Sequence, residues 1–257
     1  MRSFEEILHS HKELNRKWIS ITNENRNELK NTGLGIRLLE VDFAVMAIKD
    51  KNWSNSKQHF YTASLLDEIA VAKFNSNQFS FGLRLIAYPI LSDNNELITR
   101  YSKLRYQPWG KMKGMDENVS LGKSEIWCNT VQFFMANDNV GIERNLNIIE
   151  TKTLKKLPKK EEGLKDDYEF YKALHSCDKA KMEEILEKLV SPKIHKKRND
   201  NTLLNQYISL PALGYAKLAW RNNIEVEVSS NLIPKELLPI KPLNNYEIPY
   251  DFLKEIV

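Results

Sequence analysis

The 257-residue sequence has few cysteines and no long apolar run. Its two cysteines, Cys128 and Cys177, are spaced neither as a zinc-binding pair nor as part of a disulfide-rich scaffold. No stretch approaches the ~18 to 20 uninterrupted apolar residues of a transmembrane helix. The N-terminal stretch has charges in every apolar window and no small-residue cleavage site, which argues against a secretory signal. We therefore expect a reduced, cytoplasmic protein without a membrane segment.

Motifs that indicate catalysis or ligand binding are also absent. The chain contains no Walker loop, no HExxH helix, no GxSxG elbow and no acidic calcium loop. Gly33 and Gly35 resemble the start of a dinucleotide-binding fingerprint, but Leu38 occupies the third position and no strand precedes them, so we expect the glycines to open a helix. The five histidines are scattered, and His9 and His11 lie two residues apart, on different helix faces. We expect no cofactor, no bound metal and no enzymatic activity.

One enzymatic alternative stays open. His175 and Cys177 flank a predicted turn between two helices, where a cysteine–histidine dyad would need a third group to orient the base. The sequence identifies no such group. The neighbouring Asp166 and Asp167 lie at a predicted helix start, where the helix dipole favours negative charge, so a local structural role explains them.

The positive charge of the chain is mild. The net charge is +4, and much of the excess lies in two lysine-rich runs, Lys152–Lys160 and Lys193–Arg198. Such runs can bind phosphate backbones, which makes a helical nucleic-acid-associated protein the main alternative function. No aromatic residue interrupts the runs as in single-strand binders, and charge runs of this size are common on solvated surfaces. We therefore do not expect nucleic acid as the partner.

Hydrophobic residues recur with a helical period along nearly the whole chain. A typical stripe is formed by Met182, Ile185, Leu186 and Leu189, with Asp178 as the N-cap of that helix. The pattern predicts an all-α, multi-helix array of antiparallel helical hairpins. We expect a single helical domain, 1–257, with an alternative division into N-terminal helices (1–155) and a C-terminal hairpin, arm and cap (160–257).

The most strongly patterned segment lies near the C-terminus. Ser209 is a candidate N-cap for an apolar helix, and Asn222–Asn223 tolerates the left-handed conformation that ends helices. Alternation of apolar and polar residues over Ile224–Val228 then predicts a short extended arm with one buried face. Pro234 follows at the start of one short helical turn. All of these features are structural rather than catalytic.

This segment resembles a known family. The stretch from Leu210 to Leu238 reads LPALGYAKLAWRNNIEVEVSSNLIPKELL and is similar to the terminal segment of bacterial polymorphic-toxin immunity proteins, most closely immunity family 49. The positions that carry the resemblance are Ala212, Leu213, Ala216, Ala219, Arg221, Ile224, Val226, Val228, Leu232, Pro234 and Leu237. The preceding helical hairpin, Tyr168–Val190, also resembles the family, so the likeness is mainly in the last hundred residues or so.

The resemblance implies a non-enzymatic protein that binds a cognate toxin domain and neutralises it, typically a toxin delivered between competing bacteria. It implies no catalytic or ligand-binding residue. A net charge of +4 does not mimic nucleic acid as a whole, so the chemistry of the toxin stays open.

We predict the partner-binding surface in the loop between Arg105 and Ser120, outside any helical stripe. Aromatic residues commonly anchor protein interfaces, and Tyr106 and Trp109 lie in this loop. The charged candidates in the same loop are Lys111, Asp116 and Glu117. The structural alternative is that Trp109 folds back and caps the end of a helical hairpin.

Overall fold

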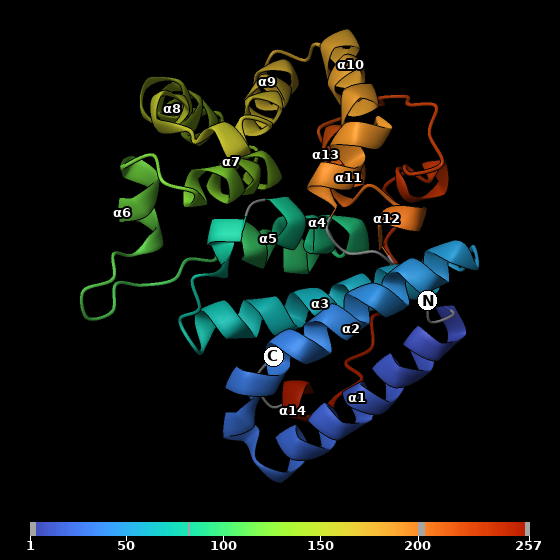
Figure 1. The fold of residues 1–257 in the computed structure, drawn as a ribbon. Helices are drawn as coiled ribbons and strands as arrows, with labels where there is room; N and C mark the ends of the chain where they lie inside the picture. The colour runs from blue at the N-terminus through green and yellow to red at the C-terminus, as the bar shows by residue number, and fades with distance from the viewer. Residues whose placement is uncertain (1–3, 82, 200–203, 255–257) are drawn as a thin grey trace.

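The computed structural model describes residues 4–81, 83–199 and 204–254. Within these ranges the chain forms fourteen α-helices and no β-strand, so the all-α prediction is confirmed (Figure 1). The helices are α1 (Phe4–Glu24), α2 (Leu29–Lys49), α3 (Trp53–Ala72), α4 (Leu83–Ser92), α5 (Asn95–Lys103), α6 (Met115–Ser120), α7 (Glu125–Ala136), α8 (Asn139–Ile148), α9 (Leu164–His175), α10 (Lys179–Val190), α11 (Pro192–Arg198), α12 (Leu204–Tyr207), α13 (Leu210–Arg221) and α14 (Asp251–Lys254). Short 3₁₀ or π-helical turns occupy Arg26–Glu28, Gln78–Phe81, Ile149–Thr153, Leu154–Lys156, Lys159–Glu161 and Lys235–Leu237.

The three long helices α1, α2 and α3 pack against one another in chain order (Figure 1). α1 and α2 are antiparallel, since the Thr22 and Thr32 hydroxyls hydrogen-bond at 2.6 Å near their connection. At the far end of the pair, His11 Nδ1 lies 2.9 Å from Asp42 Oδ2. α2 buries residues around most of its circumference and is the central helix of this part, as its apolar sequence predicts.

The start of α2 differs from the prediction. The helix begins at Leu29, so Gly33 and Gly35 lie inside its first two turns and do not open it. At Gly35 a β-carbon would lie 2.2 Å from the Trp18 ring of α1, so the absence of a side chain permits this close approach of the two helices. A β-carbon at Gly33 would meet the flexible Leu29 side chain, at 3.3 Å.

We expect Gly35→Ala to lower the free energy of unfolding by about 1–3 kcal/mol, because the added methyl group overpacks the contact with Trp18. Gly33→Ala is the matched control on the same helix. It is expected to leave stability unchanged or to raise it by up to about 1 kcal/mol, since alanine favours the helix. Urea unfolding followed by circular dichroism measures both variants, and equal midpoints would show that Gly35 has no packing role.

α4, α7 and α13 form the middle of the remaining array, where α4 packs against α3, α7 and α13. Pro89 lies inside α4, and the helix continues beyond it to Ser92. The hairpin of α9 and α10 lies beyond this middle layer (Figure 1). Asp178 caps α10 as predicted, because its side chain accepts a hydrogen bond from the Lys181 N–H at 3.0 Å.

The C-terminal segment follows its predicted outline. Ser209 occupies the N-cap position of α13, although its hydroxyl makes no capping hydrogen bond. Asn223 adopts the left-handed conformation, with φ of 62°, just after the helix ends. Along the arm, Val226 and Val228 are buried while the polar residues beside them are exposed. The chain then crosses to α14, which packs against α1 (Figure 1).

The buried apolar side chains form one cluster that extends from Leu29 in α2 to Leu253 in α14. The cluster draws on both of the alternative parts, 1–155 and 160–257, and the single domain over 1–257 stays a prediction. No helix in the described part of the chain combines the length and the apolar composition needed to cross a lipid bilayer.

Candidate partner-binding surface

The predicted binding loop contains a tight hairpin between α5 and α6. Trp109 and Met112 exchange both backbone hydrogen bonds, at 3.1 and 2.9 Å, and Gly110 provides the positive φ of 57° in the turn. Directly opposed residues of such a pair place their side chains on the same face. Trp109 is 75% exposed and Met112 is 46% exposed, so Trp109 does not fold back. The hairpin projects from the body of the molecule (Figure 1), and its exposed large apolar side chains are those of Trp109 and Met112.

The segment that leads into this hairpin is fixed to the fold behind it. The Gln107 backbone and the Asn75 side chain exchange two hydrogen bonds, at 2.6 and 2.9 Å. Arg105, in the same segment, donates to Gln132 of α7 at 2.8 Å and to Asp116 of α6, which follows the hairpin, at 3.0 Å. The exposed tip therefore has a preformed support.

Tyr106 differs from the prediction that it is a surface anchor. Its side chain is 2% exposed, and its hydroxyl donates to Glu125 Oε1 at 2.6 Å. The Asn118 amide donates to the same hydroxyl at 2.9 Å. Burial raises the pKa of Tyr106 well above its ordinary value. Because its hydroxyl has two partners inside the fold, Tyr106 supports the hairpin from below and presents no surface to a partner.

The charged candidates lie at two places on the same surface. Lys111 is exposed in the hairpin turn. Asp116 and Glu117 begin α6, where Asp116 pairs with Arg105 and Glu117 pairs with Lys113. The surface around the apolar tip therefore carries both signs of charge.

The residues that carry the family resemblance are mostly interior. Ala212, Leu213, Ala216, Ala219, Val226, Val228 and Leu237 are buried, whereas Arg221, Ile224, Leu232 and Pro234 are partly buried. They join α13 to the arm and to the closing turn, so their role in the structure is packing.

A family model described as Immunity protein 49 matches residues 39–237, which is more than half of the chain. The chain belongs to the Immunity protein 49 family. The match contains the Trp109–Met112 hairpin and every resemblance position. It begins in α2, so it extends well beyond the C-terminal part that carries the resemblance. No curated protein and no solved structure matches the chain.

In this member of the Immunity protein 49 family, the helix that carries several resemblance positions, α13, also contains a buried lysine that the sequence patterns did not predict. Lys217 of α13 has no exposed side-chain surface, and its Nζ lies 2.7 Å from Asp93 Oδ1. It also donates to the carbonyl oxygens of Leu237, Leu238 and Pro239, at 2.7, 3.2 and 2.9 Å. Burial lowers the pKa of Lys217 to about 8, against the opposing effect of Asp93. The sequence feature that could have indicated this buried ion pair is a lysine inside the otherwise apolar stretch YAKLAW.

Asp167 has a role beyond the one expected at a helix start. It is buried, and its carboxylate accepts two hydrogen bonds from Arg198 of α11, at 2.7 and 2.8 Å. The Tyr215 hydroxyl of α13 donates to the same carboxylate. The side chain thereby connects α9, α11 and α13, and the local pattern could not show these distant partners.

The structure does not join His175 and Cys177 as a dyad. His175 Nε2 lies 3.5 Å from Glu143 Oε1, and Cys177 is exposed in a left-handed turn with φ of 57°. No hydrogen bond connects the two side chains, although both lie in the described part of the chain. Across the described ranges, no group of three or more histidine, cysteine or acidic side chains is arranged to hold a metal ion.

The two lysine-rich runs come close together at one point. Arg198, at the end of the second run, donates to the carbonyl oxygen of Gly163, shortly after the first run, at 3.2 Å. Arg198 is paired with Asp167, and the exposed Glu161 and Glu162 adjoin the lysines of the first run. Because acidic groups adjoin the lysines of the first run and pair with Arg198 of the second, this surface does not favour a phosphate backbone.

Proposed function

We propose that this member of the Immunity protein 49 family binds a toxin protein in the cytoplasm and blocks its activity, which protects the cell from a toxin delivered between competing bacteria. The observation that carries the proposal is the family match over residues 39–237. The hairpin supports it, because an exposed tryptophan on a fixed backbone is a group that commonly anchors protein interfaces. The chain acts by binding and makes or breaks no covalent bond.

The hairpin is the proposed centre of the contact. Trp109 and Met112 supply the apolar anchor, and Lys111, Asp116 and Glu117 supply a polar rim. A stable interface buries on the order of 1,600 Å² in total, so the contact extends beyond the hairpin onto neighbouring surfaces. Because the hairpin backbone is already fixed, little conformational entropy is lost on binding.

Co-expression tests the proposed function. The proposed function predicts that the gene immediately upstream encodes a toxin-like domain, and this domain is the toxin to use. We expect cells that make this domain alone to stop growing, and cells that also make the present chain to grow. A toxin domain inactivated by mutation is expected to co-elute with the chain on gel filtration. Growth arrest at matched expression, together with separate elution, would overturn the proposal.

A further inference from the structure

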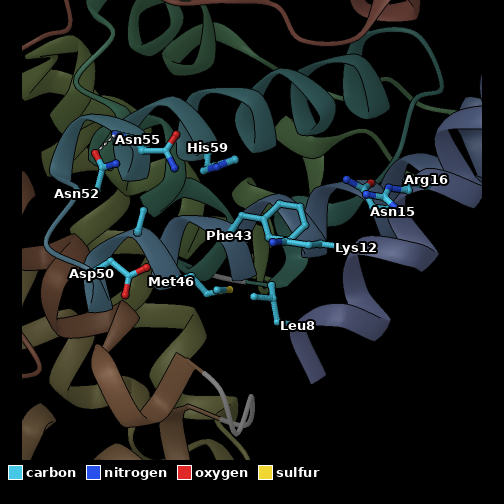
Figure 2. A pocket seen from close by; sticks show the side chains of 11 residues that line it. Leu8, Lys12, Asn15, Arg16, Phe43, Met46, Asp50, Asn52, Asn55 and His59 are labelled. Atoms are coloured by element: carbon cyan, nitrogen blue, oxygen red, sulfur yellow. Dashed lines mark hydrogen bonds between the residues drawn. The ribbon is translucent and has the colours of Figure 1, made fainter. Parts of the chain in front are cut away.

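A hollow of about 430 Å³ lies between α1, the C-terminal end of α2 and the start of α3 (Figure 2). This volume falls within the ~300–1,000 Å³ range of ligand pockets. Its α1 wall lies outside the residues that the family model matches. None of the hairpin residues lines it.

The inner wall of the hollow is apolar. It is formed by Leu8 of α1 and by Phe43, Met46 and Ala47 of α2 (Figure 2). The Phe43 and His59 rings lie 5.6 Å apart, and His59 Nδ1 lies 2.7 Å from Glu40 Oε2. These contacts hold His59 in place, so the wall is preformed.

The rim carries two cations, and no acidic side chain in the described part of the chain pairs with them. Lys12 and Arg16 lie one helical turn apart on α1, on the same side of the helix, and both are exposed. Neither makes an ion pair with a residue that the structure describes. Figure 2 shows Asp50 at the other end of the hollow from Arg16.

Asn15, between these two cations on α1, has an unpaired acceptor. Its side chain lines the hollow and is 6% exposed. The Nδ2 group donates to the Tyr250 hydroxyl at 3.3 Å, whereas Oδ1 makes no hydrogen bond. A buried acceptor without a donor is unfavourable, and an incoming N–H group removes that cost.

We propose that the hollow binds a segment of the toxin in which a large apolar side chain lies next to a carboxylate. The apolar side chain packs on Phe43 and Met46, the carboxylate pairs with Lys12 and Arg16, and a backbone N–H donates to Asn15 Oδ1. Two consecutive residues of a peptide can supply all three groups: an apolar side chain, a carboxylate and a backbone N–H. The inference rests on the proposed function and adds a second contact to it.

The hollow and the hairpin are separate contact points along α3. Asn55 and His59, near the start of α3, line the hollow, whereas Asn75, just after its end, holds the hairpin. A helix of 20 residues is about 30 Å long. Substitutions at the hollow therefore leave the hairpin intact, and the two contacts can be tested independently.

Charge reversal at the rim tests the hollow in the full chain. The dissociation constant of the complex with the inactivated upstream toxin domain is measured by isothermal titration calorimetry. We expect Lys12→Glu combined with Arg16→Glu to raise it at least tenfold. The matched control is Lys193→Glu combined with Lys197→Glu, two exposed lysines with the same spacing on α11, and it is expected to leave binding unchanged.

A second variant fills the hollow without changing its charge. Asn55→Trp, at an exposed rim position, is expected to weaken the complex at least tenfold, while Asn55→Ala leaves it unchanged. Wild-type affinity in both the charge-reversed and the filled variants overturns the hollow and leaves the proposed function standing. An equal loss in the α11 control also overturns it, because the effect is then one of overall charge. Absence of binding by the wild-type chain overturns the proposed function itself.

Discussion

Asp93→Asn is expected to lower the free energy of unfolding by about 3–5 kcal/mol, because it leaves buried cations without their central carboxylate. Asp93 has no exposed side-chain surface, and its oxygens lie 2.7 Å from the Nζ atoms of both Lys57 and Lys217. Arg221 Nη1 lies 3.8 Å away. A buried cation without its carboxylate is far less stable than the same cation in an ion pair, since protein has displaced the water that would solvate it.

Asparagine is the right replacement because it removes the charge and little else. Asp93 has a positive φ of 61°, a left-handed conformation that asparagine tolerates. The matched control is Asp116→Asn, whose side chain is 78% exposed in its pair with Arg105 and is expected to change stability by less than about 1 kcal/mol. Urea unfolding at neutral pH measures both. A loss at Asp93 no larger than the loss at Asp116 would rule out the central role.

The pH dependence gives a second readout of the same substitution. In the wild-type chain the pKa of Lys217 is about 8, below its ordinary value of 10.5. The unfolded chain therefore binds more protons between these values, and the free energy of unfolding rises with pH across that window. Asp93→Asn removes an attraction that holds the proton on Lys217, so the rise begins at lower pH. The deficit of the variant is expected to be larger at pH 6 than at pH 9.

This cluster also connects the resemblance segment to the rest of the fold. Lys217 fixes the carbonyl groups of 237–239, and Lys57 donates to the Lys241 carbonyl oxygen at 2.7 Å. Further along, the Tyr246 hydroxyl donates to the Ser92 carbonyl oxygen at 2.7 Å. The closing turn of the resemblance segment is therefore tied to α3, α4 and α13 by one buried charge centre. The centre therefore needs both α13, which supplies Lys217, and the closing turn, which supplies the carbonyl groups of 237–239.

Local patterns predicted the elements whose causes are local. The stripe in α10, the cap at Asp178 and the left-handed Asn223 follow from residues within a few positions of one another. The ion clusters do not, because Asp93 and Lys217 lie 124 positions apart and pairing between them has no period in the sequence. α6 was predicted as part of a loop because six residues are too few to show a helical stripe.

The proposed binding loop was only partly predictable for a similar reason. Its composition and its lack of periodicity correctly located an irregular segment with an exposed Trp109. Tyr106 is buried whereas Trp109 is exposed. The burial of Tyr106 depends on Glu125 and Asn118, which hydrogen-bond its hydroxyl inside the fold and lie outside the hairpin turn. The hollow could not be predicted from the sequence, since Lys12 and Arg16 have the spacing of charged residues on any solvated helix face.

Trp109→Ala is expected to weaken the toxin complex by about 2 kcal/mol or more, which is roughly thirtyfold in the dissociation constant. The reason is that 75% of this large side chain is exposed in the free chain and is available for burial in the complex. Trp109→Phe keeps part of that area, so its dissociation constant is expected to lie between those of the wild-type chain and of Trp109→Ala. Isothermal titration calorimetry with the inactivated upstream toxin domain measures each variant.

The control for this substitution is another exposed apolar side chain outside the hairpin. Val140, at the start of α8, is 79% exposed, and Val140→Ala is expected to leave the affinity unchanged. Neither Trp109 nor Val140 contributes to the buried cluster, so both variants keep the wild-type fold and a change in affinity reports on contact alone. If Trp109→Ala binds as tightly as the wild-type chain, the hairpin is not the anchor. Membership of the Immunity protein 49 family still stands in that case, and the proposed contact moves to the hollow, where the charge-reversed variant decides it.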